Sequence, residues 1–232
     1  MMMQPNSTTL LENRKRSSSE SKGVSSEVIY NTIIETLRAR GAGGSCLDFG
    51  AGQGALLELL DRTGWFSSLA GVDLMGGPLS LRQKVSWTTQ DLNLPLNLAG
   101  NRFDTVISSE VIEHLENPRA VFREFYRVLK PSGILVISTP NQESIRSKIS
   151  LLTKGHFDQF RDRDYPRHIT ALLHQDIERC ACEAGFQGGS LGFTDSGLMP
   201  LPKLAVRWQA ISPRVFRGNH FSDNVIYSCI KK

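Results

Sequence analysis

The sequence predicts an α/β fold built on a doubly wound, mostly parallel β-sheet with helices on both faces. Short apolar runs alternate along the chain with segments of helical periodicity, which is the pattern of repeated β–α–β units. A glycine-rich turn directly follows the first of these apolar runs. The length of 232 residues, of which 40% are hydrophobic, suits one such domain with additions.

The expected elements follow a polar, aperiodic segment over residues 1–24, which we expect to be disordered, and they make up one domain over residues 25–232. Strands that alternate with helices imply right-handed crossovers and a parallel sheet. Two successive strands at the end indicate an antiparallel partner at one edge. In order, the elements are a helix over Ser26–Arg40, a strand over Ser45–Phe49, a helix over Ala55–Arg62, strands over Leu69–Met75, Val85–Asp91 and Phe103–Glu110, a helix over Pro118–Leu129, a strand over Gly133–Pro140, a helix over Ala171–Ala184, and strands over Phe186–Asp195 and Ser222–Ile230.

Two segments interrupt this alternation. Residues 141–170 leave from the carboxyl end of a strand, where open parallel sheets bind their ligands, and residues 197–221 contain no acidic residue. Long loops in compact domains are usually functional or disordered, so we expect two lid-like insertions; the alternative is a pair of solvated basic loops. Their basic residues are Arg146, Lys148, Lys154, Arg161, Arg163 and Arg167 in the first, and Lys203, Arg207, Arg214 and Arg217 in the second.

Charge and composition exclude several classes of protein. The formal net charge is only +4, and no arginine-rich run indicates a nucleic-acid partner. The four cysteines lack the spacing of a zinc site or a disulfide framework. No apolar leader and no run of about 18 apolar residues occur, so we expect a cytoplasmic protein with at most peripheral membrane contact. Residues 201–216 mix apolar and basic side chains and suit either such contact or a cap over a ligand pocket.

The glycine turn lies in the stretch CLDFGAGQGALLELL, residues 46–60. Gly50, Gly52 and Gly54 remove side chains where the backbone turns tightly or a ligand approaches. Together with Ala55 they satisfy the dinucleotide fingerprint G-x-G-x-x-G/A. They equally satisfy the D-x-G-x-G-x-G pattern associated with S-adenosylmethionine, so the glycines alone leave both cofactors open.

Carboxylates at successive strand ends distinguish the two cofactors. Asp73 can accept hydrogen bonds from both hydroxyls of a ribose, which either cofactor offers. Asp48 precedes the first glycine, where it would repel a pyrophosphate but attract a sulfonium and an amino group. Asp91 can accept from an adenine amino group while Leu92 covers the ring. The series favours S-adenosylmethionine over NAD, although each acid taken separately could simply cap a turn.

The order of these motifs resembles that of class I S-adenosylmethionine-dependent methyltransferases. The motifs are LDFGAGQG, GVDLM, TQDLNLPL, FDTVISSEVIEHLENP and VLKPSGILVISTPN, and SDNVIYSCIKK resembles the closing strand of that fold. The resemblance covers roughly residues 28–193 and implies seven strands in the order 3-2-1-4-5-7-6. It also implies where the cofactor binds, with Asp48 near its methionine portion. The expected cofactor contacts are Asp48, Gly50, Gly52, Gly54, Asp73, Leu74, Asp91, Leu92 and Glu110.

The string E-x-x-E-H after the fourth strand offers Glu110, Glu113 and His114, which would share one face of a helical turn. Carboxylates and an imidazole together suit Mg, Mn or Zn. The string is similar to that of ubiquinone-pathway O-methyltransferases and of small-RNA terminal 2′-O-methyltransferases, where a later histidine completes a metal site; the matching residue here is His168. His114 and His168 are therefore the candidate catalytic residues. In many small-molecule methyltransferases a similar string works without metal, with the histidine packing or acting as a base.

The first insertion resembles that of methyltransferases acting on sugars or lipid-linked glycans, and its basic residues suit a phosphate-bearing acceptor. We therefore expect O-methylation of a small or lipid-linked hydroxylated acceptor such as a sugar, a glycan or a quinone-like compound. The rivals are an RNA 2′-O-methyltransferase and a non-catalytic subunit that binds S-adenosylmethionine. The modest charge counts against RNA.

Overall fold

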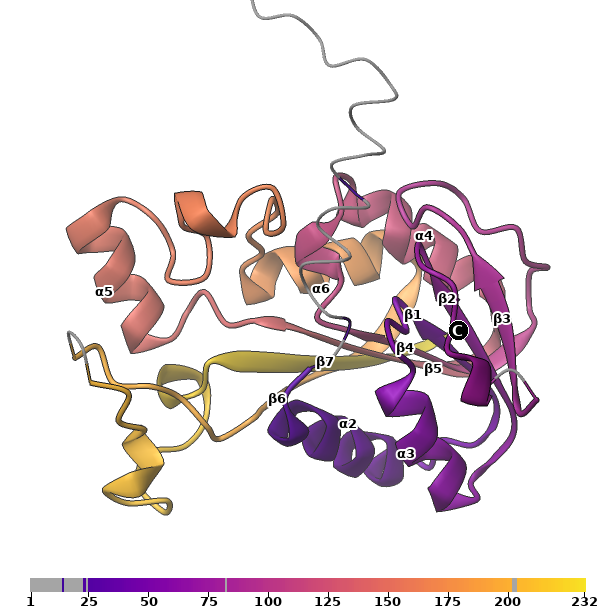
Figure 1. Ribbon diagram of the computed structural model, residues 1–232, viewed down its shortest axis with the longest axis horizontal. Coiled ribbons are helices and arrows are strands. Elements are labelled where there is room, and N and C mark those ends of the chain that lie inside the picture. The colour runs from indigo at the N-terminus through magenta and orange to yellow at the C-terminus, as the bar shows by residue number, and fades with distance from the viewer. Residues whose placement is uncertain (1–13, 15–22, 24, 82, 202–203) are drawn as a thin grey trace, which may run out of the picture.

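The computed structural model describes residues 14, 23, 25–81, 83–201 and 204–232. The segment expected to be disordered, residues 1–24, lies outside the described residues except for Arg14 and Gly23. The described chain forms a central sheet with helices on both sides (Figure 1).

The sheet has seven strands in the order β3-β2-β1-β4-β5-β7-β6, which confirms the predicted order. All neighbouring strands pair in parallel except β7, which runs antiparallel to both β5 and β6. The carboxyl ends of β1, β2, β3, β4 and β5 therefore share one edge. The strands are β1 (Gly44–Phe49), β2 (Phe66–Asp73), β3 (Val85–Thr89), β4 (Phe103–Ser109), β5 (Leu129–Pro140), β6 (Phe186–Phe193) and β7 (Asn224–Lys231).

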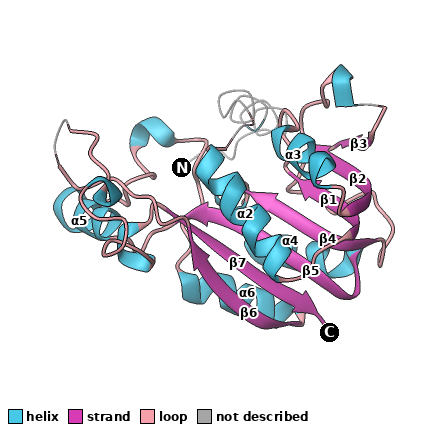
Figure 2. Ribbon diagram, turned by 90° about the horizontal axis from the view of Figure 1, so that it is seen from below, coloured by secondary structure: helices cyan, strands magenta, loops and turns pink. Residues whose placement is uncertain are grey.

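Helices α2 (Glu27–Ala39) and α3 (Ala55–Thr63) cover one face of the sheet, and α4 (Pro118–Val128) and α6 (His174–Ala184) cover the other (Figures 1 and 2). Helix α5 (Ile145–Lys154) lies beyond the sheet. Single turns of 3-10 helix occur at η1 (Leu79–Leu81), η2 (Ile112–His114), η3 (Asp162–Asp164), η4 (Trp208–Ala210) and η5 (Asn219–Phe221).

Each face of the sheet buries its own apolar cluster. On the α4 side, the rings of Phe49 and Phe125 meet edge to face with their centroids 4.9 Å apart. On the α2 side, Ile33, Leu37 and Leu57 are fully buried. Removing this apolar surface from water on both faces is the main force that holds the helices to the sheet.

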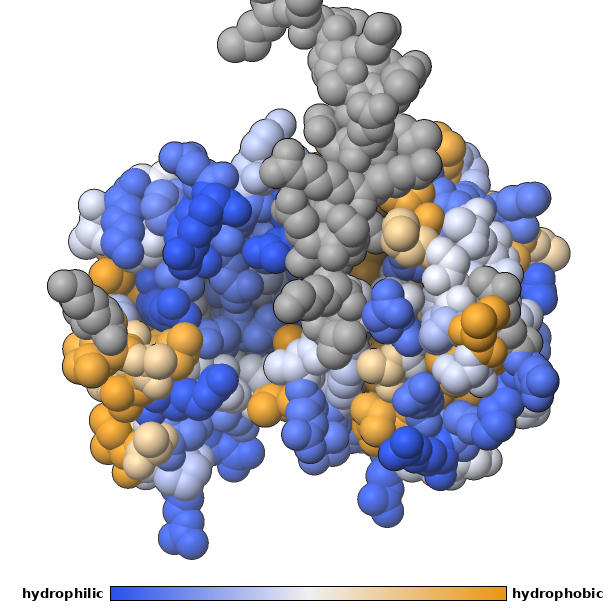
Figure 3. Space-filling model, in the orientation of Figure 1, coloured by the Kyte–Doolittle hydropathy of each residue, from blue (hydrophilic) through white to orange (hydrophobic). Residues whose placement is uncertain are grey.

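Helix α5 is the main element that sequence periodicity did not predict. It lies inside the insertion 141–170, where its N-cap Ser144 accepts a hydrogen bond from the Ser147 amide and Gly155 ends it in a left-handed conformation. Ile145, Ile149 and Leu152 recur at helical spacing, but only Ser147 and Ser150 of its side chains are buried, so the helix does not pack through its apolar residues as a core helix does. Hydrophobic surface gathers at this end of the molecule (Figure 3).

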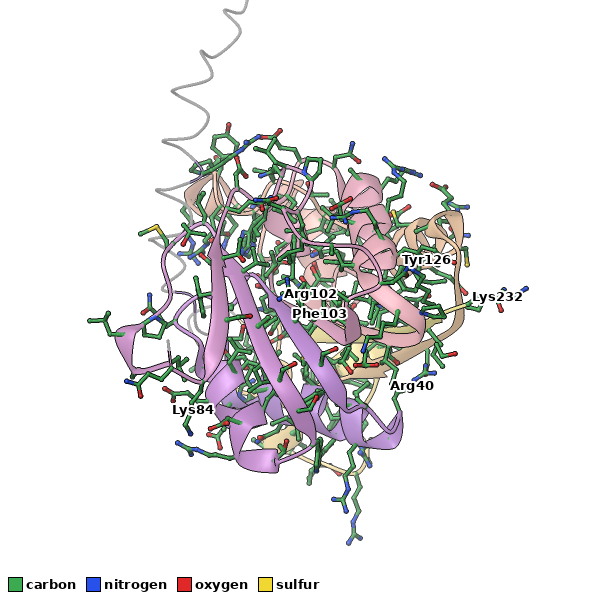
Figure 4. The ribbon with its side chains drawn as sticks, turned by 90° about the vertical axis from the view of Figure 1, so that its right-hand side faces the viewer. Arg40, Lys84, Arg102, Phe103, Tyr126 and Lys232 are labelled. Carbon is green, nitrogen blue, oxygen red and sulfur yellow. The ribbon has the colours of Figure 1, made fainter. Side chains whose placement is uncertain are left out.

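Two cations link strand β7 to the helices on the two faces of the sheet. The Arg40 guanidinium, after α2, donates to the Ser228 hydroxyl of β7 at 3.1 Å. The Lys231 ammonium lies 4.5 Å from the centroid of the Tyr126 ring on α4 and donates to the Leu129 carbonyl. Figure 4 shows Arg40 and Tyr126 on the side of the molecule where the chain ends at Lys232. Among the described residues, no helix is both long and apolar enough to cross a membrane.

Candidate active site

A cavity of about 960 Å³ opens at the carboxyl ends of the parallel strands. This volume lies near the upper end of the range of about 300–1,000 Å³ that is typical of small-molecule and cofactor pockets. Eight of the nine residues expected to contact the cofactor line it, as do Glu113, His114 and His168. The ninth, Gly54, is the N-cap of α3 and packs behind the loop against Leu81.

The glycine loop brings its backbone to the cavity wall. Gly50 has a φ of 83°, which disfavours any residue with a side chain, and a Cβ there would collide with Val111. Gly52 donates its amide N–H to the Asp73 carboxylate at 2.9 Å. The other carboxylate oxygen of Asp73 accepts from the Met75 amide, also at 2.9 Å. Asp73 therefore fixes the loop, and each of its oxygens keeps a lone pair for a ligand hydroxyl.

Asp48 is the acid whose surroundings most clearly favour a cationic ligand. It is 2% exposed, and its Oδ1 has no hydrogen-bond partner among the described residues. Burial and the neighbouring charge of Asp73 raise the pKa of Asp48 to about 7. A buried carboxylate without a partner is costly, and a sulfonium or amino group beside it would remove that cost. The residues around Asp48 and Asp73 therefore fit S-adenosylmethionine.

The pKa of Asp48 predicts a pH dependence of cofactor binding. The bound cation interacts with the ionised carboxylate, so affinity for S-adenosylmethionine is expected to fall by up to about tenfold per pH unit below pH 7. Calorimetric titrations between pH 5.5 and 7.5 measure this dependence, and Asp48→Asn should flatten it. An equal slope in the two proteins would remove Asp48 from cofactor binding.

Asp91 has a partner that the sequence did not predict. The Arg14 guanidinium donates to its Oδ2 at 2.5 Å and to Glu116 at 2.6 Å. The other Asp91 oxygen accepts from the Asn93 amide at 3.0 Å. Arg14 and Asp91 both line the cavity, so an adenine amino group that reaches Asp91 must displace or share the Arg14 hydrogen bond.

The E-x-x-E-H string does not form one helical face. Glu110 has a φ of 56°, and the single turn η2 begins only at Ile112. The Glu110 carboxylate accepts from the Ser138 hydroxyl at 2.9 Å and from the Asn224 amide group at 2.7 Å. The Glu110 carboxylate is therefore held by Ser138 and Asn224, apart from the group of described residues formed by Glu113, His114 and His168, and its part in a metal site stays a prediction.

Glu113, His114 and His168 do come together. Each offers one ligand atom, and these atoms all lie within 4.8 Å of one another. Glu113 is 1% exposed; its Oε2 accepts from Thr139 at 3.0 Å, whereas its Oε1 has no partner among the described residues. Burial raises the pKa of Glu113 to about 7. A carboxylate oxygen left open beside two imidazoles can hold a divalent cation.

Main-chain carbonyls of the first insertion set the tautomer of both histidines. Nδ1 of His114 lies 2.6 Å from the Arg167 carbonyl, and Nδ1 of His168 lies 2.7 Å from the Gln159 carbonyl. Since a carbonyl only accepts, each Nδ1 carries the proton and each Nε2 keeps its lone pair. The ring centroids are 5.0 Å apart. This arrangement suits metal ligation, where the second ring nitrogen is commonly held by a carbonyl.

Both imidazoles are held neutral. Burial, together with the nearby cation of Arg167, lowers the pKa of His114; burial, His114 and Arg167 lower that of His168 to about 4. Sequence reasoning gave Arg167 no role beyond its charge, and the one available signal was its position next to His168.

Hydrogen bonds from its main chain hold the first insertion against this site. The amides of Ile169 and Thr170 both donate to the Glu113 carbonyl at 3.0 Å. The Thr170 hydroxyl donates to the Leu115 carbonyl at 2.5 Å. Residues 167–170 therefore hold the E-x-x-E-H segment in place, in addition to carrying His168.

Comparisons with known proteins agree with this geometry. A family model described as "Methyltransferase domain" matches residues 26–191. The ubiquinone biosynthesis O-methyltransferase of Psychrobacter arcticus is 27% identical over 158 residues, which is 62% of this chain and 60% of that protein. The mitochondrial ubiquinone biosynthesis O-methyltransferase of Rattus norvegicus is 32% identical over 115 residues, 45% of this chain and 33% of that protein. The chain thus spans less than two thirds of these relatives.

Solved structures share the fold. A SAM-dependent methyltransferase from Archaeoglobus fulgidus superposes with a TM-score of 0.61 at 20% identity, covering 97% of this chain and 100% of that one. Phosphoethanolamine N-methyltransferase 2 of Haemonchus contortus, in complex with S-adenosyl-L-methionine, has a TM-score of 0.55 at 18% identity, covering 87% of this chain and 52% of that one. From the matched domain, the strand order and these neighbours, the chain belongs to the family of class I S-adenosylmethionine-dependent methyltransferases.

Proposed function

We propose that this protein transfers a methyl group from S-adenosylmethionine to a hydroxyl oxygen of a small or lipid-linked acceptor. The observation that carries the proposal is the cluster of Glu113, His114 and His168 in the same cavity as Asp48 and Asp73. One end of the cavity suits a cationic adenosyl cofactor, and the other end suits the activation of a weakly acidic hydroxyl.

At the cofactor end, Asp73 would hold the ribose and Asp48 would face the positive charge of the methionine portion. S-adenosylmethionine supplies a methyl group on a sulfonium, which leaves as a neutral thioether. The leaving group therefore needs no proton from the protein. What remains for the chain is to align the acceptor oxygen with the methyl group and to remove its proton.

At the acceptor end, neither histidine is a strong base. An imidazole whose pKa is about 4 is poorly matched to the proton of a hydroxyl near neutral pH, because the best base has a pKa close to the working pH. The same neutrality favours ligation, since a metal needs the free lone pair of Nε2. We therefore propose that Glu113, His114 and His168 hold a divalent cation, which makes a bound hydroxyl more acidic. Two nitrogens and one oxygen favour a transition metal such as Zn or Mn over Mg.

Two further observations support oxygen as the accepting atom. Both curated relatives reported above are named as O-methyltransferases. The second is the cluster itself. A neutral amine is nucleophilic without a metal, whereas a hydroxyl benefits from a cation that makes it more acidic.

The acceptor is expected to carry a phosphate group. The cations of Arg167 and Arg207 line the cavity and suit such a group.

The test is methyl transfer from labelled S-adenosylmethionine to hydroxylated sugars, lipid-linked glycans, quinone-like phenols and fractionated cell extract. We expect label in an ether that resists mild acid and base. Label in RNA would favour the 2′-O-methyltransferase alternative. Binding of the cofactor with no labelled product in any fraction would favour a non-catalytic subunit.

Removal of metal is expected to abolish turnover. Dialysis against a chelator should lower the rate by at least about 100-fold while cofactor affinity stays unchanged, since the cation acts on the acceptor. Added Zn or Mn should restore the rate better than Mg. Elemental analysis of the purified protein and of Glu113→Gln gives a second readout, because the variant should lose bound metal. Full activity without metal would contradict the proposed cation.

A further inference from the structure

The two insertions meet at one end of the molecule. Helix α5 contacts η5, and the Asn141 amide group donates to the Asn219 carbonyl at 2.7 Å. The Asn219 amide group donates in turn to Glu143 at 3.4 Å. Figure 1 shows α5 and, in orange to yellow, the described part of 197–221 at the same end of the molecule, and Figure 2 likewise shows α5 beyond the sheet. Residues 145–154, 197–201 and 204–221 are called the insertion face below.

The insertion face carries a concentration of exposed apolar side chains. Seven of the fifteen large hydrophobic residues that are exposed in the described chain lie on it. Leu152 is 85% exposed and Val215 is 68% exposed. Figure 3 shows hydrophobic surface along this edge of the molecule. The seven are Ile149, Leu151, Leu152, Leu201, Leu204, Ile211 and Val215.

Internal contacts stabilise the part of the insertion face that carries Leu204, Ile211 and Val215. The rings of Trp208, Phe216 and Phe221 pack against one another with centroid distances of 5.0–5.2 Å. Gln209 donates from its amide group to the Phe216 carbonyl at 2.7 Å and to the Phe221 carbonyl at 3.1 Å. The segment therefore has its own aromatic cluster, while Leu204, Ile211 and Val215 are exposed to solvent.

The charge of the insertion face has one sign. Residues 144–157 and 196–222 contain no aspartate or glutamate. Lys148, Lys154 and Arg214 are exposed, and none of the three forms an ion pair with another described residue. Exposed apolar groups and exposed cations on the same insertions match the boundary of an anionic bilayer, where phosphate groups lie above the acyl chains.

We propose that the insertion face is a peripheral docking surface for a bilayer rich in anionic phospholipid. Leu204, Ile211, Val215 and Leu152 would enter the acyl boundary, while Lys148, Lys154 and Arg214 would meet the headgroup phosphates. Ser196 and Arg207 line the catalytic cavity, so docking would turn its mouth toward the lipid. This inference goes beyond the proposed methyl transfer and does not depend on it, because binding to vesicles requires neither cofactor nor acceptor.

The test is co-sedimentation of the full chain with vesicles of phosphatidylglycerol and phosphatidylcholine, compared with vesicles of phosphatidylcholine alone. We expect binding to the anionic vesicles that weakens as salt is raised. The double variant Leu204→Ser/Ile211→Ser should reduce binding at least about tenfold. Arg214→Gln should reduce it about fivefold, the effect of one cation near an anionic surface.

Leu79→Ser is the matched control. Leu79 is 79% exposed on η1, outside both insertions and outside the cavity lining, so its replacement should leave binding unchanged. Equal melting temperatures for all variants exclude unfolding as the cause. The proposal is overturned if the chain fails to sediment with anionic vesicles, or if the double variant binds as the wild type does. Self-association that the double variant abolishes, without vesicle binding, would overturn it in favour of an interface between two copies.

Discussion

Replacing His168 with alanine is expected to lower kcat by at least about 100-fold, because it removes a ligand of the proposed cation, while leaving the affinity for S-adenosylmethionine unchanged. The His168 imidazole is neutral, offers Nε2 to the cavity and lies within 4.8 Å, by its ligand atom, of those of Glu113 and His114. Its loss removes one of three groups that can act on the acceptor hydroxyl, and none of the groups expected to hold the cofactor. Steady-state turnover measures the first effect, and calorimetry with S-adenosylmethionine measures the second.

His156 provides the matched control for this experiment. It belongs to the same insertion, and its Nδ1 likewise contacts a main-chain carbonyl, that of Phe157 at 3.0 Å, but it does not line the cavity. His156→Ala should therefore keep its turnover within about twofold of wild type. If His168→Ala turns over as fast as His156→Ala, His168 has no part in the reaction. A parallel loss of cofactor affinity would mean that the substitution disturbs the whole cavity instead.

Replacing Asp73 with alanine is expected to weaken binding of S-adenosylmethionine by about 10²–10⁴-fold. Hydrogen bonds to a charged group contribute about 1.5–3 kcal/mol each, and the carboxylate would lose two from the ribose hydroxyls. It would also release the Gly52 amide, so the glycine loop would lose the contact that fixes it. Calorimetry or fluorescence titration with the cofactor measures the change in Kd.

Asp61→Ala serves as the control for removing a carboxylate. Asp61 lies on α3 and pairs with Lys84 at 2.7 Å on the exposed surface, where such pairs contribute little. The Asp61→Ala variant should therefore leave the Kd for S-adenosylmethionine unchanged. The Kd of Asp73→Asn should lie between the values of Asp61→Ala and Asp73→Ala, because an amide oxygen can still accept a hydrogen bond from the glycine loop. A loss of less than about tenfold in Asp73→Ala would mean that the ribose is held elsewhere.

The parts of this structure that could be predicted from sequence are those fixed by local chemistry. Buried parallel strands leave apolar runs such as residues 133–137, and glycines mark the turn at Gly50 because a side chain would collide there. The strand order came from resemblance rather than from the residues themselves. The acids Asp48 and Asp73 follow strands of the parallel sheet, so their meeting at one edge could be anticipated.

What could not be predicted depends on contacts between distant segments. Glu110 leaves the expected cluster because its amide donates to the Ser138 carbonyl at 3.1 Å, which holds it in a left-handed conformation that no local pattern encodes. Arg14 reaches Asp91 across 77 positions of sequence. The tautomers of His114 and His168 depend on carbonyls, and every residue has a carbonyl, so sequence carries no signal for them.

The position of β7 has a consequence for biosynthesis. This strand comes last among the described elements, yet it pairs with β5 on one side and β6 on the other. While residues 224–231 are still inside the ribosome, the nascent chain has an unpaired edge on β5 and a free β6, a state open to wrong pairing and to chaperones. Asn224 of β7 also holds Glu110 at the cavity wall. The wall of the cavity is thus complete only after β7, the last of the described strands in sequence, has paired with β5.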